Sequence, residues 1–239
     1  MMTKKIALIT DTHLEEEMPF LSITEAQEHF EEILSDIANR NIKDIIFCGD
    51  IGSKKSHDSF FDALKSYSYN LVLGNHDIIN ELNDRLHTSH ISEEFCYYYD
   101  EYGFRFIMMD SSKGNVSQEQ LSWLKSITNT HLALLIFIHH PLLKIPTTVD
   151  TLYPLKNRAD IVHILHNLPT DCTVFCGHYH MNDERTYKNI TQLTTSAVSY
   201  QIQKNTLAVQ IDTSTFGYRI IEISDNTVFT QVITFKSIK

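Results

Sequence analysis

Positive charge is scarce in this chain of 239 residues. Twenty lysine and arginine residues stand against thirty aspartate and glutamate residues, which gives a formal net charge of −10 with neutral histidines. Proteins that hold nucleic acid through its phosphate backbone need basic side chains to neutralise the phosphates. The deficit therefore argues against stable nucleic-acid binding, whereas it is compatible with clusters of acidic metal ligands.

Long apolar runs are absent as well. No segment approaches the roughly 18 consecutive apolar residues of a membrane-spanning helix. The first residues, Met1–Lys5, lead directly into the segment IALIT, which is too short for the apolar region of a signal peptide. We therefore expect a cytoplasmic protein without a membrane segment. No repeat, low-complexity stretch or linker divides the chain, so residues 1–239 are expected to form one domain, and a homo-oligomer stays open.

Cysteine is rare, and the CxxC spacing of many zinc and redox sites does not occur. The four cysteines, Cys48, Cys96, Cys172 and Cys176, lie within or at the ends of apolar segments that resemble strands. This placement is typical of reduced thiols in a protein core rather than of disulfides or zinc ligands.

What the sequence does contain is an alternation of strand-like and helix-like segments. A buried strand is predicted at residues 4–10, and a helix follows at 22–40, where Ser22 and Glu25 are placed as a capping box. Strands at 44–48, 70–74 and 132–138 are likewise followed by helical segments at 56–67, 78–86 and 158–168. This alternation predicts layered α/β structure with some parallel strand pairing.

Other segments add a hairpin and a strand-rich last quarter. Residues 95–99 and 104–109 are predicted to form a hairpin, and a helix at 117–127 carries Ser117 and Gln120 as a second capping box. Five short β-branched segments follow, at 185–193, 195–202, 206–212, 217–223 and 227–235. They are expected to be mostly antiparallel strands of a second sheet.

Polar side chains that can bind metals follow five predicted strands, at the point where each strand ends. They are Asp11 and His13; Asp50; Asn75, His76 and Asp77; His139 and His140; and His178 and His180. Because ligand sites in layered α/β proteins lie at the carboxyl ends of strands, we expect these side chains to converge. Any one of the patterns is typical of a turn or a surface loop, but turns do not explain five of them in order at strand ends.

The residue types indicate the kind of site. Carboxylate, imidazole and amide oxygen without thiolate suit divalent ions, with Mn or Fe preferred and Zn as an alternative. Two sets of four ligands can be formed: Asp11, His13, His180 and Asp50 in the first, and Asn75, His139, His178 and a shared Asp50 in the second. A shared carboxylate can bridge two cations, and a pair about 3.5 to 4 Å apart is the arrangement used for in-line displacement at phosphorus. His140, which follows His139, is expected either to contact substrate or to pack on Pro141.

The ordered motifs D-x-H, G-D, G-N-H-D, H-H-P and G-H-x-H, from Asp11 to His180, resemble the calcineurin-like metallophosphoesterase superfamily. The resemblance implies the same two ligand sets, with His76 in contact with the phosphoryl group. It also implies a four-layer α/β/β/α sandwich with two central mixed β-sheets.

Departures from known motifs separate the branches of this superfamily. The segment GDIGSKK lacks the D-R-G continuation of the Ser/Thr protein phosphatases, and GNHDIIN lacks the arginine that follows there. His76 replaces the arginine of lipid A precursor pyrophosphatases and the cysteine of small archaeal-type phosphodiesterases. The expected lack of a secretory leader and of added domains points away from secreted nucleotidases and DNA-repair nucleases. The chain then most resembles the class III cyclic nucleotide phosphodiesterases (Icc-type) and the related glycerophosphodiesterases, also at residues 106–124 and 216–223.

The sequence thus predicts a dinuclear-metal-dependent phosphoester hydrolase that uses a metal-activated hydroxide. A phosphodiesterase for a small nucleotide or glycerophosphodiester is favoured. His76 is expected to protonate the departing alkoxide or stabilise the transition state, and Asp77 to orient the His76 ring. Asn75, His76 and His140 are the expected substrate contacts, and Gly74 is expected to provide a sharp turn. Two alternatives stay open: a phosphomonoesterase, and a non-catalytic interaction scaffold of the same fold.

Overall fold

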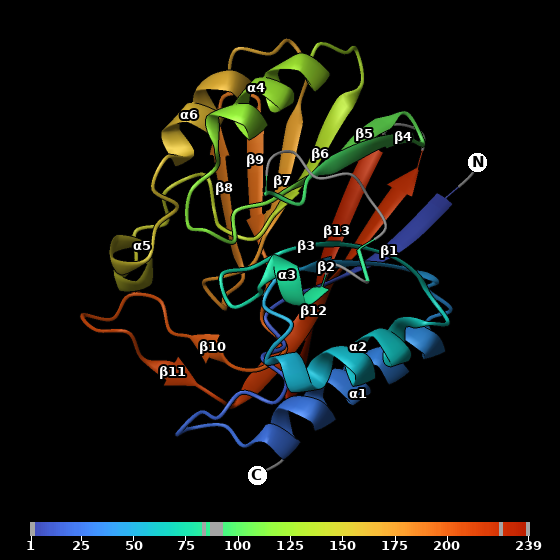
Figure 1. Cartoon of the computed structure of the whole chain (residues 1–239), viewed down its shortest axis with the longest axis vertical. Coiled ribbons are helices and arrows are strands. Elements are labelled where there is room, and N and C mark those ends of the chain that lie inside the picture. Colours follow the sequence, from blue (N-terminus) through green and yellow to red (C-terminus); the bar gives the residue numbers. More distant parts are fainter. Residues whose placement is uncertain (1–2, 83–84, 87–92, 225–226, 238–239) are drawn as a thin grey trace.

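Two mixed β-sheets pack face to face, and helices cover their outer faces (Figure 1). The computed structural model describes residues 3–82, 85–86, 93–224 and 227–237. The first sheet has the strand order β13-β12-β1-β2-β3. Its strands are β1 (Thr3–Ile9), β2 (Asp44–Cys48), β3 (Ser68–Val72), β12 (Thr215–Ser224) and β13 (Thr227–Lys236). The first three run parallel, whereas β12 pairs antiparallel with both β1 and β13.

The second sheet has the order β4-β5-β6-β7-β9-β8. Its strands are β4 (Tyr97–Glu101), β5 (Phe104–Met109), β6 (Ala133–Ile138), β7 (Cys172–Cys176), β8 (Asp183–Tyr187) and β9 (Ile190–Thr194). The four inner strands run parallel, and the edge strands β4 and β8 are antiparallel to their neighbours. The parallel strands of both sheets therefore present their carboxyl ends to connecting loops, where the motif residues lie.

Helices cover both outer faces of the paired sheets. The first sheet carries α1 (Ile23–Asn39) and α2 (His57–Leu64), which follows the 3-10 helix η1 (Lys54–Ser56). The second sheet carries α4 (Gln118–Ile127) and α6 (Arg158–Leu165). Two short helices, α3 (Ile79–Leu82) and α5 (Thr148–Leu152), lie in loops that follow β3 and β6. This four-layer order confirms the predicted α/β/β/α sandwich.

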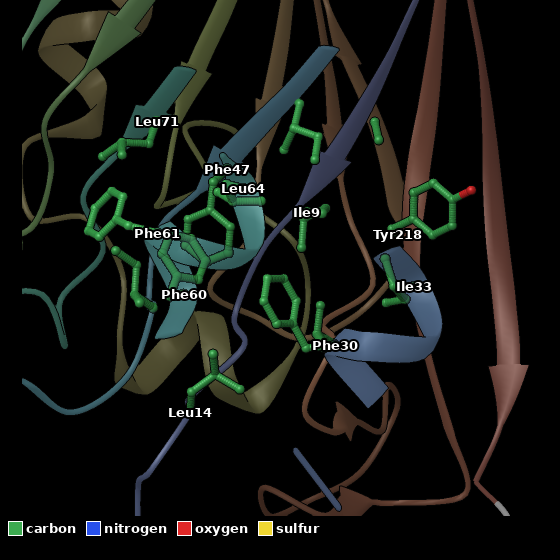
Figure 2. Packing of buried hydrophobic residues seen from close by; sticks show 14 of the residues in the cluster. Ile9, Leu14, Phe30, Ile33, Phe47, Phe60, Phe61, Leu64, Leu71 and Tyr218 are labelled. Carbon is green, nitrogen blue, oxygen red and sulfur yellow. The ribbon is translucent and has the colours of Figure 1, made fainter. Parts of the chain in front are cut away.

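The central strands are buried on both faces, which explains their continuous apolar sequence. In β1, Ile6 and Leu8 pack against the second sheet, whereas Ala7 and Ile9 pack toward α1 and α2. Figure 2 shows the cluster beneath these helices, where aromatic and aliphatic side chains of α1, α2 and the sheet interdigitate. Alternate side chains of a central strand thus pack into two different hydrophobic cores, one between the sheets and one beneath the helices. Both cores hold the ends of the strand in place.

The prediction for the last quarter of the chain was wrong in one respect. Its strands do not form a sheet of their own: β8 and β9 join the second sheet, with β9 parallel to β7, while β12 and β13 complete the first. β10 (Gln201–Ile202) and β11 (Ile211–Asp212) form a separate two-stranded ribbon. Residue composition indicates strands, but it does not choose between partners that are distant in the sequence.

One of the two predicted capping boxes is complete. At α1, the Ser22 hydroxyl accepts from the Glu25 N–H, and the Glu25 carboxylate accepts from the Ser22 N–H. At α4, Ser117 caps the N–H of Gln120, but the Gln120 side chain bonds the backbone of Asp110 instead. The Ser117 N–H donates to Glu94, a distant carboxylate that takes the place of the predicted partner.

The predicted state of the cysteines is confirmed. All four lie among the described residues, and each is a buried thiol outside any disulfide. Within the described part of the chain, none of the helices combines the length and the apolar character that crossing a bilayer requires.

Candidate metal centre

The loops after β1, β2, β3, β6 and β7 bring histidine and aspartate side chains from distant parts of the sequence together. Three groups place one ligand atom of each member within 4.8 Å of the others: Asp11, His13 and His180; His13, Asp50 and His76; and Asp50, His139 and His178. Asp50 belongs to two of these groups. The carboxylate expected to bridge two cations therefore lies between the other side chains of both predicted ligand sets.

The two buried aspartates face several imidazole rings. Asp50 Oδ2 lies 3.2 Å from His139 Nε2 and 3.7 Å from His13 Nε2. Asp11 Oδ1 lies 3.3 Å from His180 Nε2 and 3.9 Å from His139 Nε2. Both carboxylates can therefore share cations with histidines on more than one side.

Each of these imidazoles is held through its other ring nitrogen by a fixed oxygen. His13 Nδ1 lies 3.0 Å from Glu16 Oε2, His139 Nδ1 2.8 Å from the Cys48 carbonyl, His180 Nδ1 2.9 Å from the Tyr200 carbonyl and His178 Nε2 3.0 Å from the Tyr153 carbonyl. A ring nitrogen that donates to such an oxygen leaves the opposite nitrogen with a lone pair for a metal. Among the described residues, the buried His139 Nε2 has no hydrogen-bond partner. The donor set therefore fits divalent cations.

The backbone at these positions is unusual. Asp11, His13, Asp50, His178 and His180 all have positive φ angles, between 46° and 67°. Residues other than glycine rarely adopt this left-handed backbone conformation, and those that do cluster at functional sites. Half of the ten described non-glycine residues with positive φ are thus proposed ligands, which indicates that the loops are shaped around the site.

Glycines next to the proposed ligands leave room for them, and Gly49, with a φ of 90°, also adopts a backbone conformation that other residues rarely do. A Cβ on Gly74 would lie 2.1 Å from Asp50 Oδ1, and one on Gly49 would lie 2.5 Å from His139 Nδ1. Gly74 does not have a positive φ, so the expected turn-making role is replaced by close approach. Only a glycine at this position leaves the Asp50 carboxylate in its place.

The electrostatics of the site keep the Asp11 carboxylate charged and the His178 imidazole neutral near pH 7. Burial alone would raise the pKa of Asp11, but His180 and His139 lower it to about 2. Burial opposes protonation of His139, yet Asp50 and Asp11 raise its pKa to about 10, so a metal ion would have to displace the proton from its Nε2. Burial and the neighbouring His139 lower the pKa of His178 to about 4, so His178 is neutral near pH 7 and available as a ligand.

A cavity of about 310 Å³ lies beside the three groups. Its lining includes Asp50, Asn75, His76 and His178 together with aromatic and aliphatic residues. The site is therefore accessible to a small molecule, and exposed Asn75 and His76 face that molecule's entry.

Comparison with known proteins now identifies the family. The model of the calcineurin-like phosphoesterase superfamily domain matches residues 4–214. The chain belongs to this superfamily. It is 26% identical over 242 residues to a Fibrobacter succinogenes protein named probable cyclic nucleotide phosphodiesterase, with 95% of this chain and 93% of the relative covered.

The chain is also similar in sequence to a second relative and in fold to a solved structure. An Arcobacter nitrofigilis protein named probable glycerophosphodiester phosphodiesterase GpdQ is 27% identical over 174 residues, with 66% of this chain and 64% of the relative covered. The crystal structure of a dimetal phosphatase from Danio rerio has a TM-score of 0.69 at 14% identity, with 98% of each chain covered. Together, family, relatives and fold make the chain a metal-dependent phosphoesterase.

In this calcineurin-like phosphoesterase, the partner of His76 differs from the expected one. Both oxygens of Asp77 accept backbone N–H groups, from Asp50 and Gly74 on one oxygen and from Ile51 on the other. Asp77 thus braces the loops, and the expected contact with the His76 ring is replaced. The Asp77 carboxylate already accepts three backbone hydrogen bonds, so its hydrogen-bonding capacity is used without the exposed His76 ring.

Glu16 takes the place that was expected for Asp77. Its Oε2 lies 3.0 Å from His13 Nδ1 and 3.1 Å from His76 Nδ1. The contact with Glu16 raises the pKa of His76 to about 9, so the ring can carry a proton at neutral pH. Sequence reasoning missed Glu16, although its position three residues after His13 is a detectable signal.

His140 also differs from its predicted role as a substrate contact. Its ring is buried, lies 4.1 Å from the His178 ring between centroids, and has Nδ1 2.9 Å from the Ser111 hydroxyl. It is absent from the described residues that line the cavity. His140 therefore packs against the His178 ring in this phosphoesterase.

Proposed function

We propose that the chain is a phosphodiesterase for small phosphodiesters, with two divalent metals held by the predicted ligand sets. The single observation that supports this most is Asp50, which belongs to two ligand groups, one with His13 and exposed His76 and the other with His139 and His178. The names of the relatives add cyclic nucleotides and glycerophosphodiesters as candidate substrates. Mn or Fe is the preferred metal and Zn the alternative. We treat residues 1–239 as one domain, and the cytoplasmic location and the oligomeric state stay predictions.

We assign the following chemistry to the residues of this chain. When bound, two divalent ions would lower the pKa of water, so that a nucleophile forms at neutral pH, and would polarise the phosphoryl group. Asp11, His13, Asp50 and His180 would hold one ion, and Asp50, Asn75, His139 and His178 the other. His76, held by Glu16, is placed to donate a proton to the departing oxygen.

A diester is favoured over a monoester by the charge of the cavity. Among the described residues that line it, none is lysine or arginine. A monoester carries up to two negative charges near neutral pH, whereas a diester carries one, so the diester needs less positive charge from the chain. The three histidine and aspartate groups, which could hold metal ions, argue against the scaffold alternative.

Metal analysis together with two chromogenic substrates tests the proposal. The purified chain, loaded with Mn, should contain two metals and should hydrolyse bis(4-nitrophenyl) phosphate faster than 4-nitrophenyl phosphate. Asp50→Asn should lose most metal and activity together, because one carboxylate serves both sites. Asp36→Asn is the matched control, since Asp36 accepts from Arg40 and Tyr218 on the helical face and lies outside the three ligand groups.

The outcomes separate the alternatives. Faster hydrolysis of the monoester would favour a phosphomonoesterase. An Asp50→Asn variant that kept two tightly bound metals and near-normal turnover would refute the bridging assignment.

A further inference from the structure

One part of the cavity lining, called the apolar wall here, is rich in rings and aliphatic side chains. It is formed by Phe20, Val149, Tyr153, Tyr200, Ile202, Val209 and Ile211. Phe20 and Tyr200 meet edge to face, with their ring centroids 4.8 Å apart. The Tyr200 ring in turn lies 4.2 Å from the His180 ring. The apolar wall therefore begins directly at the proposed metal ligands.

Three segments that are distant in the sequence build this wall and are tied to one another. The β10–β11 ribbon lies beside α5 on one side of the molecule (Figure 1), and the Thr148 hydroxyl donates to the Thr206 carbonyl at 2.6 Å. The Ile202 N–H donates to the His180 carbonyl at 2.9 Å, which joins the ribbon to the loop of the G-H-x-H motif. Phe20 adds the third side from the loop before α1. The wall is thus anchored to the same loops that carry the ligands.

The chain leaves large apolar side chains exposed at this wall. Phe20 is 39% exposed and Tyr153 is 57% exposed. Exposed aromatic side chains at the mouth of a small cavity are typical of ligand contact, since they gain stability when a ring or an alkyl group covers them. A ring packed edge to face on Phe20 and Tyr200 would complete an aromatic cluster beside the phosphoryl position.

The charges around the wall exclude a second anionic group on the substrate. The described lining residues contribute no lysine or arginine, and Lys204 of the neighbouring hairpin donates to Asp183 at 2.6 Å. A second phosphate or a carboxylate would therefore find no counter-charge there. Burying several hydroxyls of a glycerol group against valine and isoleucine would also cost free energy, because polar groups lose water without gaining partners.

On the basis of the proposed phosphodiester hydrolysis, we propose that the substrate carries a flat, uncharged ring that packs against Phe20 and Tyr200. Phe20 and the β10–β11 ribbon are then the determinants of specificity. The class of substrate is a phosphodiester with an aromatic group on one side, rather than a glycerophosphodiester or a polyphosphate.

Three methyl phosphodiesters that differ in one group test the proposal. They are the 2-phenylethyl, 2-cyclohexylethyl and ethyl methyl phosphates, with glycerol methyl phosphate as a fourth substrate. For the Mn-loaded chain, kcat/KM for the phenyl compound should exceed that for the ethyl compound by about tenfold or more, because an apolar ring is buried and an aromatic pair forms. The cyclohexyl compound should fall between them, and the glycerol compound should be no better than the ethyl compound.

Variants then assign the preference to the wall. Phe20→Ala should reduce the phenyl-to-ethyl ratio to within about threefold, because the contact with the ring is lost. Phe20→Leu should still have a higher kcat/KM for the phenyl and cyclohexyl compounds than for the ethyl compound. It should no longer favour the phenyl compound over the cyclohexyl compound. Phe229→Ala is the matched control, because Phe229 is a 65% exposed phenylalanine on β13, outside the cavity lining.

Binding without turnover gives an independent measurement. Calorimetry with 2-phenylethylphosphonate and ethylphosphonate, which have no ester bond, should show the same preference for the ring and the same loss in Phe20→Ala. Equal rates for the phenyl and ethyl diesters, a preference for glycerol methyl phosphate, or equal losses on all substrates in Phe20→Ala would overturn the proposed ring contact. If the loaded wild-type chain hydrolysed no diester at all, the proposed function itself would be wrong, and calorimetry would still test the ring contact.

Discussion

Replacing Gly74 with alanine should displace the Asp50 carboxylate without straining the backbone of residue 74. A Cβ at this position would lie 2.1 Å from Asp50 Oδ1, 2.5 Å from the Asp50 backbone nitrogen and 2.8 Å from Asp50 Cγ, so both the carboxylate and the backbone of Asp50 would have to shift. An ordinary contact begins at about 3.4 Å, so the oxygen must move by about 1.3 Å, and a misplacement of about 1 Å can reduce activity by about 10²-fold. We expect kcat/KM on a chromogenic diester to fall by about 100-fold or more, and metal affinity by about tenfold or more.

The assay compares metal content, kcat/KM and melting temperature in Gly74→Ala and Gly114→Ala. A Cβ on Gly114 would meet no atom within 4 Å, but Gly114 has a φ of 69°, so alanine there is strained without touching the site. Both variants should lose about 1–3 kcal/mol of stability, by overpacking in one and by strain in the other. Only Gly74→Ala should lose metal and activity. If Gly74→Ala bound two metals at wild-type affinity with near-normal turnover, the close approach of Gly74 to Asp50 would not govern the site.

Three further substitutions test the roles of individual side chains. His76→Ala should keep both metals and lose about 10²- to 10⁴-fold on an alkyl diester but much less on a nitrophenyl diester, whose leaving group scarcely needs a proton; loss of a metal would instead make His76 a ligand, as its place in one ligand group allows. Glu16→Gln should lower alkyl-diester activity and weaken one metal by about 10- to 100-fold, because the carboxylate holds the rings of both His13 and His76; an unchanged ratio of alkyl to nitrophenyl rates would contradict its action through His76. Burial lowers the pKa of His29, so the unfolded chain binds more protons below pH 6.5 and stability should fall there with a slope of up to about 1.4 kcal/mol per pH unit. In denaturant titrations between pH 5 and 7, His29→Gln should flatten this slope, and an identical slope would show that His29 does not contribute.

The sequence alone determined the layers and the positions of the candidate ligands. Strands buried on both faces must be apolar throughout, and helices on a sheet must repeat their apolar residues at helical spacing, so both patterns appear in local sequence. The side chains after each strand were equally visible. Because parallel strands of one sheet end at a common edge, the sequence accounts for Asp11 lying near Asp50 and for His139 lying near His178, whereas the meeting of the two pairs depends on how the two sheets pack. Metal binding by these residues stays a prediction.

Tertiary structure decided the contacts that depend on packing between distant segments. In the folded chain, Asp77 accepts hydrogen bonds from backbone amides, the His76 ring contacts Glu16, and the His140 ring packs against His178. Tertiary structure also distributed the C-terminal strands between both sheets and formed the apolar wall beside the metal groups. These outcomes depend on which hydrogen-bond partner or apolar surface lies nearest in space. Sequence spacing fixes the side of an element on which a residue lies, but not the distant group that it meets there.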